Sequence, residues 1–125
     1  MMLTLTTLKG SYSIHRFAPD AIVPDTIQES RFYSVSRTDE ELSIVCEATI
    51  DLYALQSETD WRILKIVGPL DFSLTGVLAA VSELLAGREI SIFALSTFDT
   101  DYILVRESKL AEAKRVMTDA GHRII

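Results

Sequence analysis

Cysteine is nearly absent from this sequence, since Cys46 is the only one among 125 residues. An internal disulfide is therefore excluded, and such usage is typical of proteins from a reducing cytosol. Basic residues are also in deficit: 12 Lys and Arg face 18 Asp and Glu, for a formal net charge of −6. Because nucleic acids and anionic membranes attract basic surfaces, this balance argues against both as partners.

Long apolar runs are missing as well. No stretch approaches the ~20 residues that a transmembrane helix needs, and the N-terminal "MMLTLTTLKG" lacks the basic region and long apolar segment of a signal peptide. We therefore expect a cytoplasmic protein. Apolar residues still make up 48% of the chain, which is enough to form the core of one domain or of two small modules.

The second half of the chain has the clearer pattern. Apolar runs predict strands at residues 61–67, 90–97 and 102–107, and a short closing strand at 122–125. Between the first two strands, apolar residues recur at helical spacing, with Asp71 or Ser73 as the predicted N-cap and Gly87 as the predicted stop. The apolar positions of this helix are Leu74, Val77, Leu78, Val81, Leu84 and Leu85.

A second helix is predicted to start at Ser108 and to end at Gly121. Its inward face is predicted to carry Leu110, Ala113, Met117 and Ala120. The resulting order, β-α-β-β-α-β, is typical of the α+β ferredoxin-like sandwich, in which two helices cover one face of a four-stranded antiparallel sheet.

The first half contains weaker strands and no clear helix. Residues 3–17 predict one or two strands with a break or bulge at Gly10, residues 31–37 and 42–46 predict a hairpin, and residues 47–60 read as a connector. Shifted by sixty, residues 33–47 align without a gap with residues 93–107, whereas "AIVPDTIQES" stands where the second copy has a helix. We infer two related modules, a degenerate one at 1–60 and a complete one at 61–125.

The repeat, the β-α-β-β-α-β order, "GPLDFSLTGVL" and "ISIFALSTFDTDYILV" together resemble the ACT domain, above all in tandem-ACT proteins such as cytosolic arginine sensors. The resemblance implies a regulatory protein that binds a small effector, usually an amino acid, at an interface between ACT modules. It implies neither catalysis nor a cofactor.

The resemblance also implies where the ligand binds: at the loop after the first strand of a module and at the segment that joins its second and third strands. Ser73, at the start of the predicted helix, and Thr100, in the same turn as Asp101, complete the expected set. The expected ligand contacts are Gly68, Pro69, Leu70, Asp71, Ser73, Thr97, Phe98, Thr100 and Asp101.

These residue types suit a free amino acid. The start of a helix offers unpaired N–H donors to a carboxylate, Gly68 permits a close backbone approach, and Asp101 could receive the ammonium. Phe98 could cover the aliphatic part of the ligand. Two structural alternatives stay open: Asp71 could cap the helix itself, and "FDTD" could be ordinary turn chemistry.

Other functions have less support in the sequence. No nucleophile–base pair or metal-ligand set can be assembled from neighbouring segments, so we predict neither an enzyme nor a metal site. His15 and His122 are expected at a surface or a strand end, and Cys46 as a small buried hydrophobe. The alternative function is an oligomerisation module with a vestigial ligand site. We expect it to be a homodimer, because a bare sheet needs a covering partner.

Overall fold

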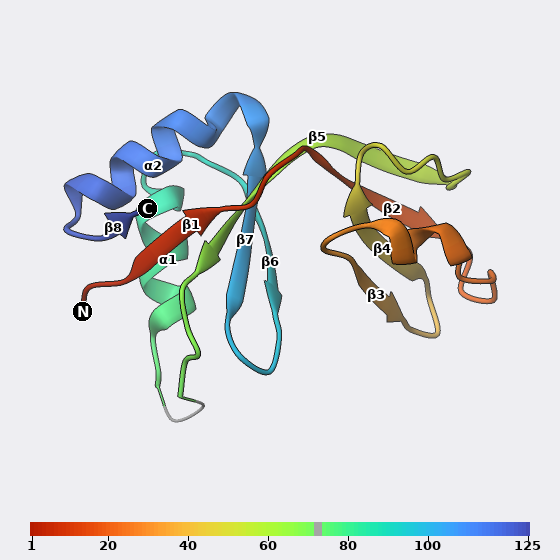
Figure 1. Cartoon of the computed structure of the whole chain (residues 1–125), viewed down its shortest axis with the longest axis horizontal. Helices are drawn as coiled ribbons and strands as arrows, with labels where there is room; N and C mark the ends of the chain where they lie inside the picture. Colours follow the sequence, from red (N-terminus) through yellow and green to blue (C-terminus); the bar gives the residue numbers. More distant parts are fainter. Residues whose placement is uncertain (72–73) are drawn as a thin grey trace. The chain divides into compact units, whose positions relative to one another are not determined.

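The computed structural model describes residues 1–71 and 74–125, which form two compact units. Unit 1 consists of residues 1–9 and 62–125, and unit 2 consists of residues 10–61. The longest strand, β5 (Gln56–Ile66), belongs to both units, because its first half pairs in unit 2 and its second half in unit 1 (Figure 1). It begins five residues before the strand predicted from Trp61.

Unit 1 has the predicted ferredoxin-like plan. After β5 come α1 (Val77–Ala86), β6 (Ile92–Ser96), β7 (Asp101–Arg106), the 3₁₀ turn η2 (Glu107–Lys109), α2 (Leu110–Asp119) and β8 (Arg123–Ile124). The two halves of the hairpin are antiparallel, and β7 lies between β6 and β5. The predicted order of strands and helices is therefore confirmed, and so is the α+β fold class.

One strand of unit 1 comes from the beginning of the chain. Strand β1 (Thr4–Thr7) lies between β5 and β8, antiparallel to the former and parallel to the latter. Leu5 of this strand pairs with Ile66 on one side and Ile124 on the other and is fully buried. The sheet thus has one strand more than the four predicted, and its order is β6-β7-β5-β1-β8.

Both helices of unit 1 pack on one face of this sheet, because residues of α1 and α2 share a core with alternate residues of the strands. The buried members of this core are Leu3, Leu5, Leu64, Ile66, Val77, Val81, Leu85, Ile90, Ile103, Val105, Ala113 and Met117. Ile63 and Leu104 alternate with them along β5 and β7 and are fully buried too, so the other face is also covered at these positions.

Helix α1 begins later than its apolar pattern predicts. Its N-cap is Gly76, which has a left-handed φ of 79°. No side chain caps the helix at this residue. A residue in that conformation interrupts a right-handed helix, so Leu74 stays outside it and is half exposed. Asp71 is therefore not the cap of this helix, and the prediction for Ser73 lies outside the described residues.

Each helix of unit 1 ends in a Schellman motif, in which one left-handed residue turns the chain. At the end of α2 this residue is Gly121 (φ 96°), as predicted, with His122 N–H donating to the Met117 carbonyl at 3.0 Å. At the end of α1, Gly87 is right-handed and Glu89 (φ 57°) takes the turn, with Ile90 N–H donating to the Leu85 carbonyl at 3.0 Å.

The inward face of α2 differs in part from the prediction. Ala113 and Met117 are fully buried and Leu110 is partly buried, whereas Ala120 is exposed because it already lies beyond the last helical turn. Val116, which the periodic pattern did not select, is buried instead.

Unit 2 repeats the strand order of a ferredoxin-like sheet without its helices. Its strands β2 (Tyr12–Phe17), β3 (Ser34–Arg37), β4 (Leu42–Glu47) and the first half of β5 are ordered β3-β4-β2-β5. A single 3₁₀ segment, η1 (Asp25–Glu29), and the connectors around it cover the core of Phe17, Ile27, Leu42, Ile44 and Cys46. The predicted hairpin and the break at Gly10 (φ 91°) are confirmed, and Cys46 is buried as expected.

The hairpins of the two units correspond with a shift of 59 residues and not the predicted 60. Strands β4 and β7 are each six residues long, and the closing pairs of the two hairpins are Arg37–Leu42 and Ser96–Asp101. A shift of one residue along a strand exchanges its two faces. The predicted shift of 60 would match Glu41 with Asp101; this match is wrong, because Leu42 occupies the position that corresponds to Asp101.

Both histidines are buried; His122 lies at a strand end, next to β8 (Arg123–Ile124), as the prediction allowed, whereas His15 is neither at a surface nor at a strand end. His122 accepts a hydrogen bond from Leu3 N–H at its Nδ1, at 3.0 Å. His15 lies within β2, is 7% exposed, and has its Nδ1 2.7 Å from the Ser57 hydroxyl. Burial lowers the pKa of His15 below 6.5, since it disfavours the charged ring.

Substituting Glu89 by glycine should stabilise the protein. The left-handed conformation strains an L-residue, so Glu89→Gly should raise the free energy of unfolding by about 1 kcal/mol. Gly121→Ala is the matched control and should lower the free energy of unfolding by a similar amount. A Cβ at this position would touch no other atom, so the cost comes only from the left-handed backbone conformation. Urea unfolding of the two variants measures both effects. A Glu89→Gly protein that is less stable than the wild type would contradict the claim that Glu89 is strained.

Acidification should destabilise unit 2 through His15. Because the pKa of the folded state is the lower one, the stability from the neutral ring is fully present above pH 6.5 and is lost as the pH falls below it. The free energy of unfolding, measured between pH 7.5 and 5, should therefore fall more steeply for the wild type than for His15→Gln, whose side chain cannot gain a proton. Equal slopes for the two proteins would refute this role.

Candidate functional site

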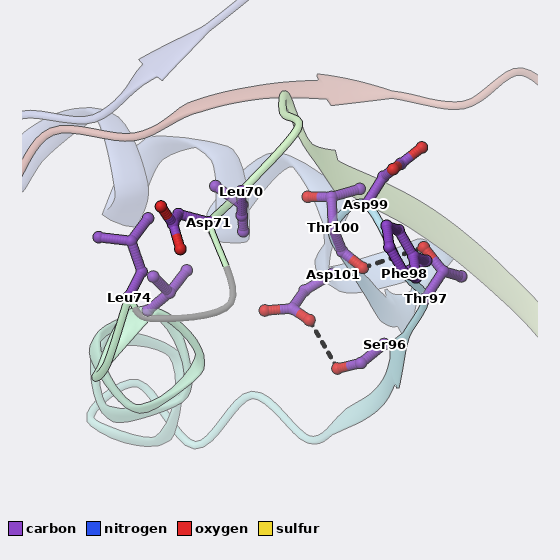
Figure 2. Close-up of a pocket in the computed structure, with 10 residues that line it drawn as sticks. Leu70, Asp71, Leu74, Ser96, Thr97, Phe98, Asp99, Thr100 and Asp101 are labelled. Carbon is purple, nitrogen blue, oxygen red and sulfur yellow. Dashed lines mark hydrogen bonds between the residues drawn. The ribbon is translucent and has the colours of Figure 1, made fainter.

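A cavity of about 230 Å³ opens in unit 1 between the segment after β5 and the turn that joins β6 to β7 (Figure 2). Its lining residues are Leu70, Asp71, Leu74, Val77, Ser96, Thr97, Phe98, Asp99, Thr100 and Asp101. Two segments that are separate in sequence thus form one depression at the end of the sheet.

The β6–β7 turn is held by its threonines. Thr97 N–H donates to the Thr100 carbonyl at 2.9 Å, and the Thr97 hydroxyl lies 3.2 Å from the same oxygen. The Thr100 hydroxyl is buried and donates to the Ile66 carbonyl at 2.6 Å, at the last residue of β5. Thr100 therefore anchors the turn to the sheet, and its hydroxyl is already used.

The segment after β5 is fastened to the same turn through its backbone. Leu70 N–H donates to the Asp99 carbonyl at 2.7 Å. A Cβ at Gly68 would lie 2.9 Å from Leu70 N, a distance that real Cβ atoms essentially never show, and 3.1 Å from Asp99 O, which is tighter than nine in ten real Cβ contacts. The absent side chain at Gly68 therefore serves an approach between two parts of the protein, where the sequence had suggested an approach to a ligand.

Asp101 presents a positioned carboxylate to the cavity. Its Oδ1 accepts a hydrogen bond from the Ser96 hydroxyl at 2.6 Å, across the closing pair of the hairpin. Figure 2 shows this carboxylate pointing into the space between the turn and the segment of Asp71. Such a bond holds the carboxylate oriented and leaves acceptor positions for a cation.

The cavity carries charge of one sign. Asp71, Asp99 and Asp101 line it, and the lining residues that the structure describes include no lysine, arginine or histidine. Three carboxylates around a small open space create a negative potential, so a positively charged group is favoured there.

The opposite side of the cavity offers different chemistry. Val77, the first residue of α1, lines it. The first N–H groups of a helix lack intrahelical partners and carry a partial positive charge, and Gly76 supplies no capping side chain. Phe98 and Leu74 add apolar surface that is 79% and 51% exposed. Carboxylates, the first residue of α1 and apolar side chains therefore line the same space.

The structure brings together six of the nine predicted contacts: Leu70, Asp71, Thr97, Phe98, Thr100 and Asp101. Gly68 and Pro69 adjoin the cavity in sequence without lining it, and Ser73 lies outside the described residues. Sequence reasoning missed Leu74, Val77, Ser96 and Asp99 as lining residues. Ser96 could have been predicted from its position opposite Asp101 at the end of the hairpin. Val77 could not, because the sequence placed the start of the helix too early.

Within residues 1–71 and 74–125, no group of three or more His, Cys, Asp or Glu side chains could hold a metal ion. None of the helices found in these ranges is long and apolar enough to cross a membrane.

Comparison with known proteins identifies relatives over much of the chain. The mouse protein named cytosolic arginine sensor for mTORC1 subunit 1 is 34% identical over 87 residues, which cover 63% of this chain and 26% of that protein. Its human counterpart is 32% identical over 94 residues, which cover 69% and 29%. The chain therefore spans less than a third of the length of these curated relatives.

Solved structures resemble the chain over its whole length. A crystal structure of a protein from Agobacterium tumefaciens has a TM-score of 0.92 and 34% identity, covering 100% of this chain and 93% of that one. The aspartokinase alpha and beta subunits have a TM-score of 0.64 at 17% identity, covering 96% and 98%, which shows the fold alone.

Two family models match the chain. A model described as an N-terminal domain matches residues 10–50, and the ACT domain model matches residues 56–119, which is more than half of the chain. The resemblance found in the sequence is thereby confirmed: this chain belongs to the ACT domain family and is similar to the cytosolic arginine sensors.

Proposed function

We propose that the chain is a regulatory protein that binds a free amino acid in the cavity of unit 1. The observation that carries the proposal is the coexistence in one small space of an oriented carboxylate, Asp101, and the amide end of α1. A zwitterion needs both, because its ammonium requires an acceptor and its carboxylate requires donors.

In this proposal Asp101 receives an ammonium or another cationic group of the ligand. Its Oδ1 is already oriented by Ser96, so binding requires little ordering of the side chain. The ligand carboxylate lies toward the first turn of α1, and Phe98 covers the aliphatic part. Asp71 and Asp99 add negative charge, so a ligand with a second positive charge should bind more tightly than a neutral one.

The names of the relatives support the choice of ligand class. The mammalian relatives are named arginine sensors, so arginine is the first amino acid to test. No cofactor and no bond-forming step are proposed. The prediction that the ligand lies at an interface between ACT modules stays a prediction, as does the cytoplasmic location.

A thermal-shift screen of the twenty amino acids tests the proposal. Binding to the native state raises its stability, so at least one amino acid at millimolar concentration should raise the Tm. Asp101→Asn keeps the shape and removes one charge, and should weaken binding about 10-fold or more, as expected for a lost charge-assisted hydrogen bond. Asp39→Asn, the same change in the unit 2 hairpin, is the control and should bind as the wild type does. A Tm unmoved by all twenty amino acids would count against the proposal.

A second candidate function is assembly into a homodimer. Within the described residues, strand β3 pairs with β4 alone, and Val35 on this edge strand is 39% exposed. Unpaired edges with apolar side chains favour pairing with another chain.

Sedimentation at micromolar concentration tests this candidate. The wild type should be a dimer, and Val35→Lys should shift it toward the monomer, because a charged side chain on an edge strand opposes pairing. Ile22→Lys, which changes an apolar residue that is 89% exposed outside the strands, should leave the dimer intact. A wild-type monomer would eliminate the candidate.

A further inference from the structure

The position in unit 2 that matches the unit 1 cavity is bridged by a side chain of the protein itself. The matching position lies between the segment after β2 and the turn that joins β3 to β4. Arg37, the last residue of β3, donates from one terminal nitrogen to the Pro19 carbonyl and from the other, at 2.8 Å, to the Ala21 carbonyl. Its guanidinium therefore joins the two segments whose counterparts border the open cavity in unit 1.

The register of the two hairpins shows that Arg37 in unit 2 corresponds to Ser96 in unit 1. Arg37 closes the β3–β4 hairpin against Leu42, and Ser96 closes the β6–β7 hairpin against Asp101. Arg37 thus takes the place of Ser96, a residue of the cavity lining, and Leu42 takes the place of Asp101. Unit 1 has a carboxylate and no cation at this closing pair, whereas unit 2 has a cation and no carboxylate.

Two backbone carbonyl oxygens beside Arg37 suit a planar cation. The segment after β2 is folded by an Ala21 N–H bond to the Ala18 carbonyl at 3.0 Å, which places two carbonyl oxygens beside one guanidinium. A guanidinium offers several N–H donors in a rigid fork and can satisfy both acceptors at once, which a single ammonium does less well. The fully buried Leu42 offers a cation no acceptor, so the contacts come from the backbone.

We propose that the Pro19 and Ala21 carbonyls form a guanidinium-binding site that the chain fills with its own Arg37. The side chain acts as a tethered ligand, and it closes the position in unit 2 whose counterpart in unit 1 is open. The further consequence, that a free amino acid binds only in unit 1, rests on the proposed function. The occupancy of the site by Arg37 does not.

Chemical rescue tests the site without any amino acid. Arg37→Ala should lower the Tm, and ethylguanidinium, which replaces the deleted atoms, should at millimolar concentration raise the Tm of this variant by about 3 °C. The same compound should leave the wild type unchanged, and ethylammonium, which lacks the fork, should not rescue.

Each outcome decides the matter. Rescue by ethylguanidinium that is confined to the Arg37 variant supports the site, whereas no rescue, an equal effect on the wild type, or equal rescue by ethylammonium overturns it. If Arg37→Ala does not fold, Arg37→Gln keeps the first part of the stem and one amide donor; it should be less stable than the wild type, and unsubstituted guanidinium, used in place of ethylguanidinium, should raise its Tm by a smaller amount. Because unit 1 and its ligand take no part in this experiment, its failure is distinct from a failure of the amino-acid screen.

Discussion

The candidate site depends on one backbone hydrogen bond, from the Leu70 amide to the Asp99 carbonyl. This bond ties the segment after β5 to the β6–β7 turn, and only a residue without a side chain at Gly68 lets the two backbones meet. The buried bond from the Thr100 hydroxyl to Ile66 fixes the same junction from the other side. Because these contacts are internal, this junction in the cavity lining is held by the protein itself.

The two units show how one strand order supports different chemistry. In each unit a hairpin closed by a four-residue turn contacts another segment, the one after β5 in unit 1 and the one after β2 in unit 2. In unit 1 the residues that close the hairpin are a hydroxyl and a carboxylate, and the space between the segments is open. In unit 2 they are a guanidinium and a buried leucine, and the arginine crosses the space. The chemistry of the position is therefore set by the closing pair and not by the sheet.

The strands and the hairpin turns could be predicted from the sequence because their signals are local. Alternating or continuous apolar residues, bounded by turn residues, marked β6 and β7 closely, and Gly121 marked the end of α2. The start of α1 was placed too early because Leu74 fits the helical spacing, while the left-handed Gly76 that stops the helix has no periodic signal. The repeat was misaligned by one residue because apolar runs match themselves equally well in either register, whereas the paired strands admit only one.

By itself, the sequence determined the order of strands and helices in unit 1, the family and the residue types around the site, since each depends on neighbours along the chain. Only the tertiary structure decided that β1 enters the sheet between β5 and β8, that Gly68 faces the protein's own backbone, and that Arg37 reaches Pro19 and Ala21. These are contacts between distant segments. They follow from how strands pair and how closely backbones approach, and no local pattern of residues encodes either.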